Sequence, residues 1–268
     1  MTLFLFLKKL VFDWETNVNY KEQKNEILKK VRNLLKLHEK GLLGGEKMPE
    51  DSNPNLPKGI DESLFYFTLP MALNYQRNSY KLWEAALLTW QDSKTKDVFE
   101  PKKVLKMSDV ELREKLSKYK VALQPNKQPQ IWKTLCQTFE ENFGGSVKKF
   151  FEKCDFDIKL IKDFVLQNKK QFPYLSGTKI LNYWLYVMTQ QSGFDFKNRQ
   201  EITVAPDTHV LQASEKLGVV TKEELKYSNI REIVSARWQE ILQGTGLMPI
   251  DIHTPFWLWS RNGFVLEL

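Results

Sequence analysis

Cysteine and histidine are scarce in this chain of 268 residues, which has two cysteines and three histidines. No Cys-x-x-Cys pair is present, so the sequence excludes a four-cysteine iron–sulfur cluster. Cys136 and Cys154 lie among apolar residues with helical spacing, and we expect two buried free thiols in a reducing compartment. His209 and His253 have no third ligand to complete a metal site, so we assign no metal ion and no cofactor.

Long hydrophobic runs are also missing. The start, residues 1–9, has an apolar run of about five residues, with no preceding basic segment and no small-residue cleavage site. Such a run is too short for a signal peptide or for a membrane span of roughly 20 residues. We therefore expect an intracellular, cytoplasmic protein without a membrane anchor, whose first residues pack on its body as a strand or helix edge.

The hydrophobic residues that are present indicate a globular, helical protein. They make up 42% of the chain and include eight tryptophans. Ile27, Leu28, Val31 and Leu34 form one stripe with a helical period, whereas the β-branched run 202–204 is too short for a sheet. We predict an all-α fold, with helices at about 20–40, 62–73, 79–92, 108–118, 130–143, 147–153, 157–170, 178–190, 207–217, 221–226, 229–243 and 253–261.

Local signals mark several helix ends and a loop. Ser108 and Glu111 have the spacing of a capping box, and Gly144-Gly145 predicts the end of the helix before it. Residues 44–59 contain three prolines and predict a loop. We expect two helical subdomains, a central bundle of 61–195 and a second one formed by 1–60 with 196–268.

The charge of the chain favours an anionic partner. The formal net charge is +7 and the pI is near 9.1. Residues 146–200 hold ten Lys or Arg against five Asp or Glu, which is +5 of the total. This region is either a solvated basic surface or a surface that contacts nucleic acid.

One lysine and one aspartate carry the strongest chemical signal. Lys179 follows the turn 173–177 and lies in the first turn of a predicted helix, and Asp207 opens another helix 28 residues later. The first helix, of roughly 12 residues, carries the chain about 18 Å away. The roughly 15 residues before Asp207 can span up to about 50 Å. The chain can therefore return, and Asp207 can face Lys179 across a groove.

At these residues the chain resembles the helix-hairpin-helix superfamily of DNA glycosylases. The family pattern is a hairpin ending in Gly-x-Lys, then a helix, then a helix start like Val-Asp-Thr-His; here it reads Gly177-Thr178-Lys179 and Pro206-Asp207-Thr208-His209. Segments 108–112 to 141–145 resemble the helices before the hairpin. Segments 179–183 and 246–259 are similar to the archaeal 8-oxoguanine glycosylase/lyase group, and the resemblance covers about 65–263.

The resemblance implies roles for both residues. Lys179 attacks C1′ of the damaged nucleoside, expels the base and leaves a Schiff base. A free lysine, with a pKa of about 10.4, is neutral in only about one molecule in a thousand at pH 7.4, so burial or a helix N-terminus must favour the neutral form. Asp207 stabilises positive charge on the sugar and assists proton transfer, unless it serves only as a helix cap.

DNA-contacting residues are expected around the hairpin. Relatives have Gly-x-Gly before the lysine helix, and here only the second glycine, Gly177, remains. A helix N-terminus still offers N–H groups to a phosphate. The remaining candidate DNA contacts are Ser176, Thr178, Lys169, Lys170 and, as the wedge that fills the gap left by a flipped base, Gln76.

The base pocket is expected at two tryptophans and a histidine. Trp257 aligns with the tryptophan that holds the flipped base in the archaeal group, and Trp83 lies at the place of that group's other stacking aromatic. Core packing is the alternative for both. His253 stands where the group has an acidic residue, and its neutral imidazole can accept one hydrogen bond.

The function that these residues imply is a bifunctional DNA glycosylase/AP lyase of base excision repair. It would remove an oxidised purine, first of all 8-oxoguanine, from double-stranded DNA through a lysine Schiff base, and cleave the strand by β-elimination. Two alternatives stay open: a glycosylase or AP lyase of the same fold for a different damaged base, and a non-catalytic helix-hairpin-helix DNA-binding protein. We expect a monomer that acts near the nucleoid.

Overall fold

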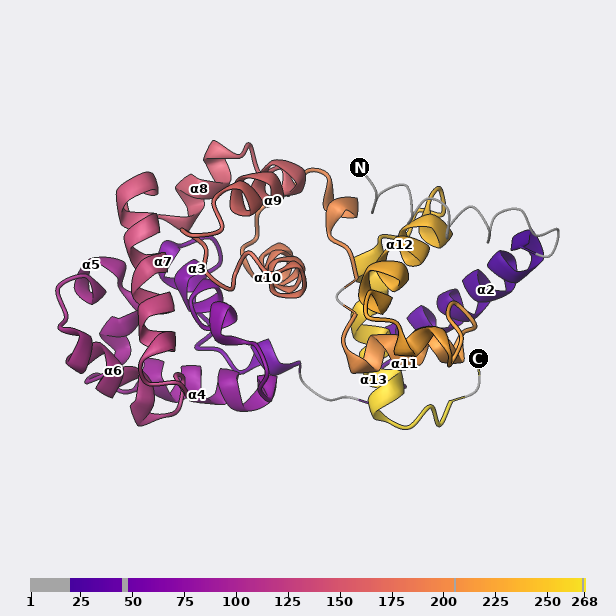
Figure 1. Ribbon diagram of the computed structural model, residues 1–268, viewed down its shortest axis with the longest axis horizontal. Coiled ribbons are helices and arrows are strands. Elements are labelled where there is room, and N and C mark those ends of the chain that lie inside the picture. The colour runs from indigo at the N-terminus through magenta and orange to yellow at the C-terminus, as the bar shows by residue number, and fades with distance from the viewer. Residues whose placement is uncertain (1–19, 45–47, 205, 267) are drawn as a thin grey trace. The chain divides into compact units, whose positions relative to one another are not determined.

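The protein is all-α, as the sequence predicted. A computed structural model describes residues 20–44, 48–204, 206–266 and 268 (Figure 1). These residues form 12 α-helices and no β-strand, with an isolated parallel bridge between Asp157 and Lys197. Among the helices described, none combines the length and hydrophobicity of a membrane-spanning segment. The segment expected to pack as a strand or helix edge, 1–9, lies outside the described residues.

The chain divides into two compact units. We call residues 47–201 the central unit, and 1–46 together with 202–268 the terminal unit. The boundaries expected from the sequence, 61 and 195, differ from this division because 48–60 and 196–201 belong to the central unit.

Hydrogen bonds explain where these two segments lie. The Tyr66 hydroxyl donates to the Ser52 carbonyl at 2.9 Å, which ties the proline-rich loop to the central unit. At the other end, the Lys162 ammonium donates to the Glu201 carbonyl at 2.5 Å. Both contacts are distant in sequence, so the pattern of prolines and apolar residues could not reveal them.

The central unit contains eight α-helices in its described residues. Its α3 contacts α8 and α10, and α7 runs along α5, α6 and α8 (Figure 1). The helices are α3 (Asp61–Thr68), α4 (Ser79–Gln91), α5 (Pro101–Val104), α6 (Asp109–Lys118), α7 (Lys127–Phe143), α8 (Val147–Lys153), α9 (Ile158–Gln167) and α10 (Thr178–Gln191), with the short 3-10 helices η1 (Pro49–Asp51), η2 (Pro70–Leu73), η3 (Lys96–Phe99) and η4 (Arg199–Glu201) between them.

An aromatic core holds the central unit together. Phe139 of α7 packs edge-on against Phe65 of α3 (centroids 5.4 Å apart) and against Phe172 (6.0 Å). Phe150 of α8 lies 4.9 Å from Phe143 and 6.3 Å from Trp184 of α10. Such rings bury a large apolar area and prefer offset or edge-on pairs. The core therefore fixes α10, which carries Lys179, against α3 and α8.

The terminal unit joins the two ends of the described chain. Its helices are α2 (Tyr20–Glu39), α11 (Thr208–Lys216), α12 (Ile230–Leu242) and α13 (His253–Arg261), with the 3-10 helices η5 (Glu224–Lys226) and η6 (Pro249–Ile252). Both α12 and α13 contact α2, and α11 packs on α13. Trp238 lies 4.9 Å from Phe256 at the centre, and its indole N–H donates to Ser214 Oγ at 2.9 Å.

A buried ion pair links α12 to η5 in the terminal unit. The Arg237 guanidinium, 6% exposed, lies 2.7 Å from Glu224 Oε1 and also donates to the Val219 carbonyl at 2.8 Å. Because a buried guanidinium needs a paired charge and filled hydrogen bonds, the two contacts together offset its desolvation.

Most predicted helix ends are confirmed. The Ser108 hydroxyl accepts from the Glu111 N–H at 3.1 Å, and Gly144, with φ of +59°, ends α7. The predicted helix at 62–73 is wrong in one respect: α3 ends at Thr68 and η2 begins at Pro70, because proline has no N–H to continue an α-helix. The predicted helix at 157–170 also ends earlier, at Gln167.

The two cysteines are buried and free, as expected. Cys136 is 0% exposed and Cys154 is 4% exposed. Burial raises the pKa of both thiols, which keeps them protonated at neutral pH.

Candidate catalytic and nucleic-acid-binding residues

The hairpin before α10 is a tight turn anchored in the core. Phe172 and Leu175 are both fully buried. The Ser176 N–H donates to the Phe172 carbonyl and the Gly177 N–H to the Tyr174 carbonyl, each at 3.0 Å. Tyr174 itself has φ of +60°, a left-handed conformation that is uncommon for a non-glycine residue. The hairpin is thus held in one shape by buried side chains and by its own backbone.

Gly177 is the N-cap of α10 and leaves the helix start open. No side chain caps this helix end, and Gly177, Thr178 and Lys179 are all exposed. A Cβ atom at Gly177 would lie 3.2 Å from the Tyr174 carbonyl oxygen, which is a tight approach. The first N–H groups of a helix have no partner within the helix. This end of α10 can therefore donate hydrogen bonds to an anion.

Lys179 is the second residue of α10 and is exposed. The helix start expected from the sequence is present, whereas the partial burial considered for this lysine is not. Tyr183 lies four residues further along the same helix, so the two side chains share one face. Lys179 is exposed, whereas Tyr183 is buried, with 9% of its surface accessible.

The partner of Tyr183 is a residue that the sequence pattern does not indicate. Its hydroxyl donates to the Glu50 carboxylate in a short hydrogen bond, and Glu50 is 5% exposed. Burial raises the pKa of Glu50 to about 7, against an ordinary value of 4.5. A carboxyl group that titrates near neutral pH thus lies beneath the face of α10 that carries Lys179.

Gln76 lies at the tip of the turn between η2 and α4. It is exposed and has φ of +49°. Its neighbour Tyr75 stacks on Tyr174 of the hairpin, with ring centroids 4.2 Å apart and planes inclined by 19°. The Lys127 ammonium lies 4.7 Å from the centroid of the Tyr174 ring. The stack places the Gln76 turn beside the hairpin.

Glutamines fix this stack from a third segment. The Tyr75 hydroxyl donates to Gln124 Oε1 at 3.2 Å and accepts from Gln128 Nε2 at 3.4 Å. Gln128 Oε1 in turn accepts from the Leu123 N–H at 2.5 Å. Sequence analysis missed Tyr75, Tyr174 and Lys127, and the one available signal was the presence of two tyrosines in turns.

Lys169 and Lys170 are exposed in the turn that leads from α9 to the hairpin. Two other cations of the basic region are in ion pairs: Lys197 lies 2.7 Å from Asp155, and Lys148 lies 3.8 Å from Glu152. Lys169 and Lys170 place positive charge directly before the hairpin.

Asp207 is the N-cap of α11 in the terminal unit. Its Oδ1 accepts from the Val210 N–H at 3.0 Å, which confirms the capping role. The residue is partly exposed, so the second carboxylate oxygen is not enclosed by the core. Arg231 Nε donates to the preceding Pro206 carbonyl at 3.0 Å and fixes the entry to the helix.

Trp257 of α13 lies between two side chains and is partly exposed. The His209 ring, on α11, contacts it at 5.3 Å with an interplanar angle of 69°, and the Arg261 guanidinium lies 4.8 Å from its centroid. His209 Nδ1 is also within 3.1 Å of Ser260 Oγ. Trp257 therefore packs on the core with part of its surface and keeps another part accessible.

Trp83 and His253 are buried. Trp83 is 0% exposed and packs against Tyr66 and Phe67, each at 5.8 Å between centroids. This assigns Trp83 to the core of the central unit instead of a base pocket, because no part of its ring is accessible. His253, 5% exposed, is the first residue of α13 and lies one helical turn before Trp257.

The candidate residues fall into two groups. The central unit holds Lys179, the open start of α10, the Gln76 turn and the two exposed lysines. The terminal unit holds Asp207, His253 and Trp257. Within the described part of the chain, no three His, Cys, Asp or Glu residues gather in a way that could hold a metal ion.

Comparison with protein-family models gives no match for this chain, and comparison with curated proteins gives none either. Function is therefore inferred from the residues and from their geometry within each unit.

Proposed function

We propose that the protein is a bifunctional DNA glycosylase/AP lyase that removes an oxidised purine, first of all 8-oxoguanine, from double-stranded DNA. One observation carries the proposal: Lys179 is an exposed amine in the first turn of a helix whose start is open to a phosphate. The combination offers a nucleophile and a DNA-backbone contact within one helical turn.

The lysine supplies the covalent chemistry. Its neutral amine attacks C1′, the bond from C1′ to the base breaks, and the base leaves with the electron pair and a proton. Ring opening of the sugar then gives a Schiff base between Lys179 and C1′. Loss of a proton from C2′ expels the 3′ phosphate by β-elimination, and water releases the lysine.

Asp207 supports this reaction as an ionised carboxylate. The cap bond from the Val210 N–H uses one of its oxygens. The other can stabilise positive charge that develops on the sugar and assist proton transfer.

The hairpin and the Gln76 turn account for DNA binding. Ser176, Gly177 and Thr178 present polar groups at the open helix start, and Lys169 and Lys170 add charge. The stacked pair Tyr75–Tyr174 holds Gln76 beside them, where it would fill the gap left by an extruded base. In the terminal unit, the accessible surface of Trp257 suits stacking on that base, whereas His253 is buried beneath it on the same helix.

Borohydride trapping tests the proposal. The protein is mixed with duplexes that carry 8-oxoguanine, other oxidised bases or an abasic site, and sodium borohydride reduces any Schiff base to a stable cross-link. We expect cross-linking on 8-oxoguanine DNA with the wild-type protein and none with Lys179→Gln. The matched control is Lys159→Gln, because Lys159 is also exposed and is also the second residue of a helix in the central unit.

Each other outcome has a defined meaning. Equal trapping by Lys179→Gln contradicts the assignment of the nucleophile. Trapping on a different lesion, or on abasic DNA alone, replaces the proposed substrate by a different damaged base or by AP lyase activity. DNA binding with neither trapping nor base excision on any duplex identifies a non-catalytic DNA-binding protein.

A further inference from the structure

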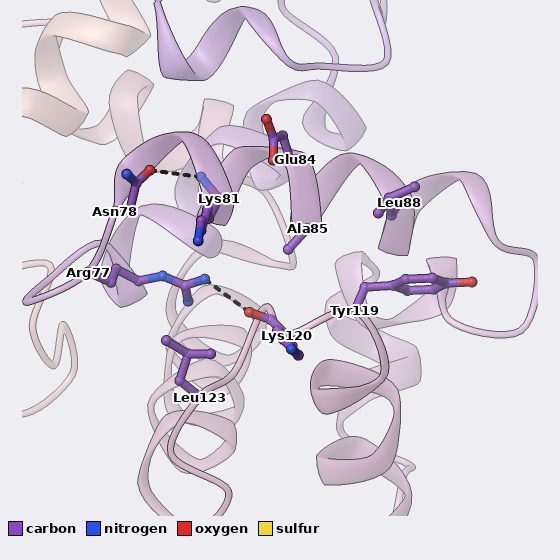
Figure 2. A pocket seen from close by; sticks show the side chains of 9 residues that line it. All are labelled: Arg77, Asn78, Lys81, Glu84, Ala85, Leu88, Tyr119, Lys120 and Leu123. Carbon is purple, nitrogen blue, oxygen red and sulfur yellow. Dashed lines mark hydrogen bonds between the residues drawn. The ribbon is translucent and has the colours of Figure 1, made fainter.

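A hollow lies in the central unit, formed by α4 and by the segment that follows α6 (Figure 2). It has a volume of about 220 Å³. Arg77 closes one end: its two terminal nitrogens donate to the Val121 carbonyl at 2.6 Å and to the Lys120 carbonyl at 3.0 Å. These bonds fix the two walls relative to each other.

The walls of the hollow are largely apolar. Leu88 of α4 is 49% exposed and Leu123 is 53% exposed, while Ala85 forms a buried part of the wall and Tyr119 presents its ring. Two half-exposed leucines on the walls of one hollow offer an apolar surface that a partner can cover, with a gain in free energy from the area removed from water. Drug-sized ligands occupy about 300–1,000 Å³, so this smaller hollow suits a single side chain.

The rim of the hollow is positively charged. Arg77, Lys81 and Lys120 line it together with one carboxylate, that of Glu84. In Figure 2 the Glu84 carboxylate points away from the side on which Arg77 and Lys120 lie. The carbonyl partners of Arg77 are neutral, so its charge is not cancelled, and its buried Nε has no hydrogen-bond partner among the described residues.

We propose that this hollow is a docking site for a partner protein, which inserts one aliphatic or aromatic side chain flanked by carboxylates. The apolar walls select the inserted side chain, and the three cations select acidic neighbours on either side of it. The inference goes beyond the proposed DNA chemistry and does not depend on it.

The composition of the hollow favours a protein segment over DNA. Interfaces with DNA are more polar and carry more positive charge than interfaces with proteins. Here two exposed leucines lie between the cations, and a phosphate would gain nothing from them. An acidic segment with an apolar anchor uses both features.

A phage-displayed library of random dodecapeptides tests the site. The full-length protein is the bait, and phage that also bind Leu88→Ser are removed. We expect enriched peptides with a Leu, Ile, Met or Phe between Asp or Glu residues. One synthetic peptide of that sequence, labelled with fluorescein, is then titrated by fluorescence anisotropy.

Matched variants define the expected affinities. Leu88→Ser should weaken binding of the peptide about tenfold or more, because the apolar surface of the leucine is no longer there to be buried when the peptide binds. Lys81→Glu should weaken binding of the acidic peptide and have less effect on the same peptide with Gln in place of Glu. Leu160→Ser is the control, because Leu160 on α9 is also 49% exposed but lies away from the hollow.

Three results would overturn the proposal. One is a library from which no peptide is enriched on the wild-type protein relative to the Leu88→Ser variant. Another is equal peptide affinity in Leu88→Ser and Leu160→Ser, both shown to be folded by circular dichroism. The third is a Leu88→Ser protein that keeps peptide binding but loses affinity for duplex DNA, which would assign the hollow to the nucleic acid.

Discussion

The carboxylate of Asp207 serves first as a helix cap. Its bond to the Val210 N–H satisfies a donor that α11 would otherwise leave open. Asparagine also caps helices well, so it preserves this bond while it removes the negative charge. Comparison of aspartate with asparagine at position 207 therefore separates the contribution of the helix cap from that of the negative charge.

We expect Asp207→Asn to bind lesion-containing DNA nearly as well as the wild-type protein and to excise the base much more slowly. Loss of one electrostatic group in an active site costs about 2.7–4 kcal/mol of transition-state stabilisation. Single-turnover excision measures the rate, and thermal melting checks that α11 is intact. An unchanged rate would show that Asp207 is a cap and nothing more.

Glu50 makes the stability of the protein depend on pH. Its pKa in the folded protein, about 7, is above the ordinary value of 4.5 because the carboxyl group is buried. The neutral form is therefore favoured by folding. This contribution is fully present below about pH 4.5, and stability falls as the pH rises towards about 7 and levels off above it.

We expect Glu50→Gln to remove most of this dependence, because glutamine stays neutral and can still accept from the Tyr183 hydroxyl. The difference between about 7 and 4.5 corresponds to about 3 kcal/mol between the two ends of the range. Urea unfolding of both proteins at about pH 5 and about pH 8 measures it. The prediction fails if the two proteins lose equal stability between these pH values.

At the scale of elements, the stack of Tyr75 on Tyr174 joins the hairpin to the turn that carries Gln76. Neither residue belongs to a helix, and the ring pair with the glutamine bonds around it adds a direct contact between the two loops. Stacked aromatic pairs contribute about 0.5–1.5 kcal/mol beyond the area that they bury.

A double-mutant cycle of Tyr75→Ala and Tyr174→Ala should give a coupling of about 0.5–1.5 kcal/mol in unfolding free energy. The Tyr174 variants also change a residue with φ of +60°, and the cycle cancels that effect because it appears in both the single and the double variant. Urea denaturation supplies the four values. Additive effects would show that the rings do not hold the loops together.

At the scale of the whole molecule, the net charge of +7 is unevenly distributed and partly neutralised. Ion pairs engage Lys197 and Lys148, which leaves Lys169 and Lys170 exposed before the hairpin. Contacts with phosphates release counterions, so DNA affinity should fall with salt, with a slope of about −0.9 per phosphate neutralised.

We expect Lys169→Ala with Lys170→Ala to weaken binding to lesion and undamaged duplexes alike. The slope of log affinity against log salt should flatten by about one for each lysine that contacts a phosphate. The control replaces Lys102 and Lys106, two other exposed lysines of the central unit, by alanine. A slope that changes equally in both proteins would place the DNA elsewhere.

The sequence by itself determined the helical class and most helix ends. Ser108, Asp207 and Gly144 act on backbone groups only a few residues away, so their effects can be read locally. The same holds for Lys179, because a turn with a glycine followed by a helical stripe is sufficient to predict its place in the first turn of α10.

Only the tertiary structure decided which of the aromatic and acidic side chains are accessible. Trp83 and Trp257 both follow a helical apolar pattern, yet Trp83 is enclosed by Tyr66 and Phe67 while Trp257 is partly exposed. Glu50 is buried and accepts a hydrogen bond from Tyr183, a residue 133 positions away in the sequence. Burial depends on segments that are distant along the chain, and hydrophobic spacing describes one segment at a time.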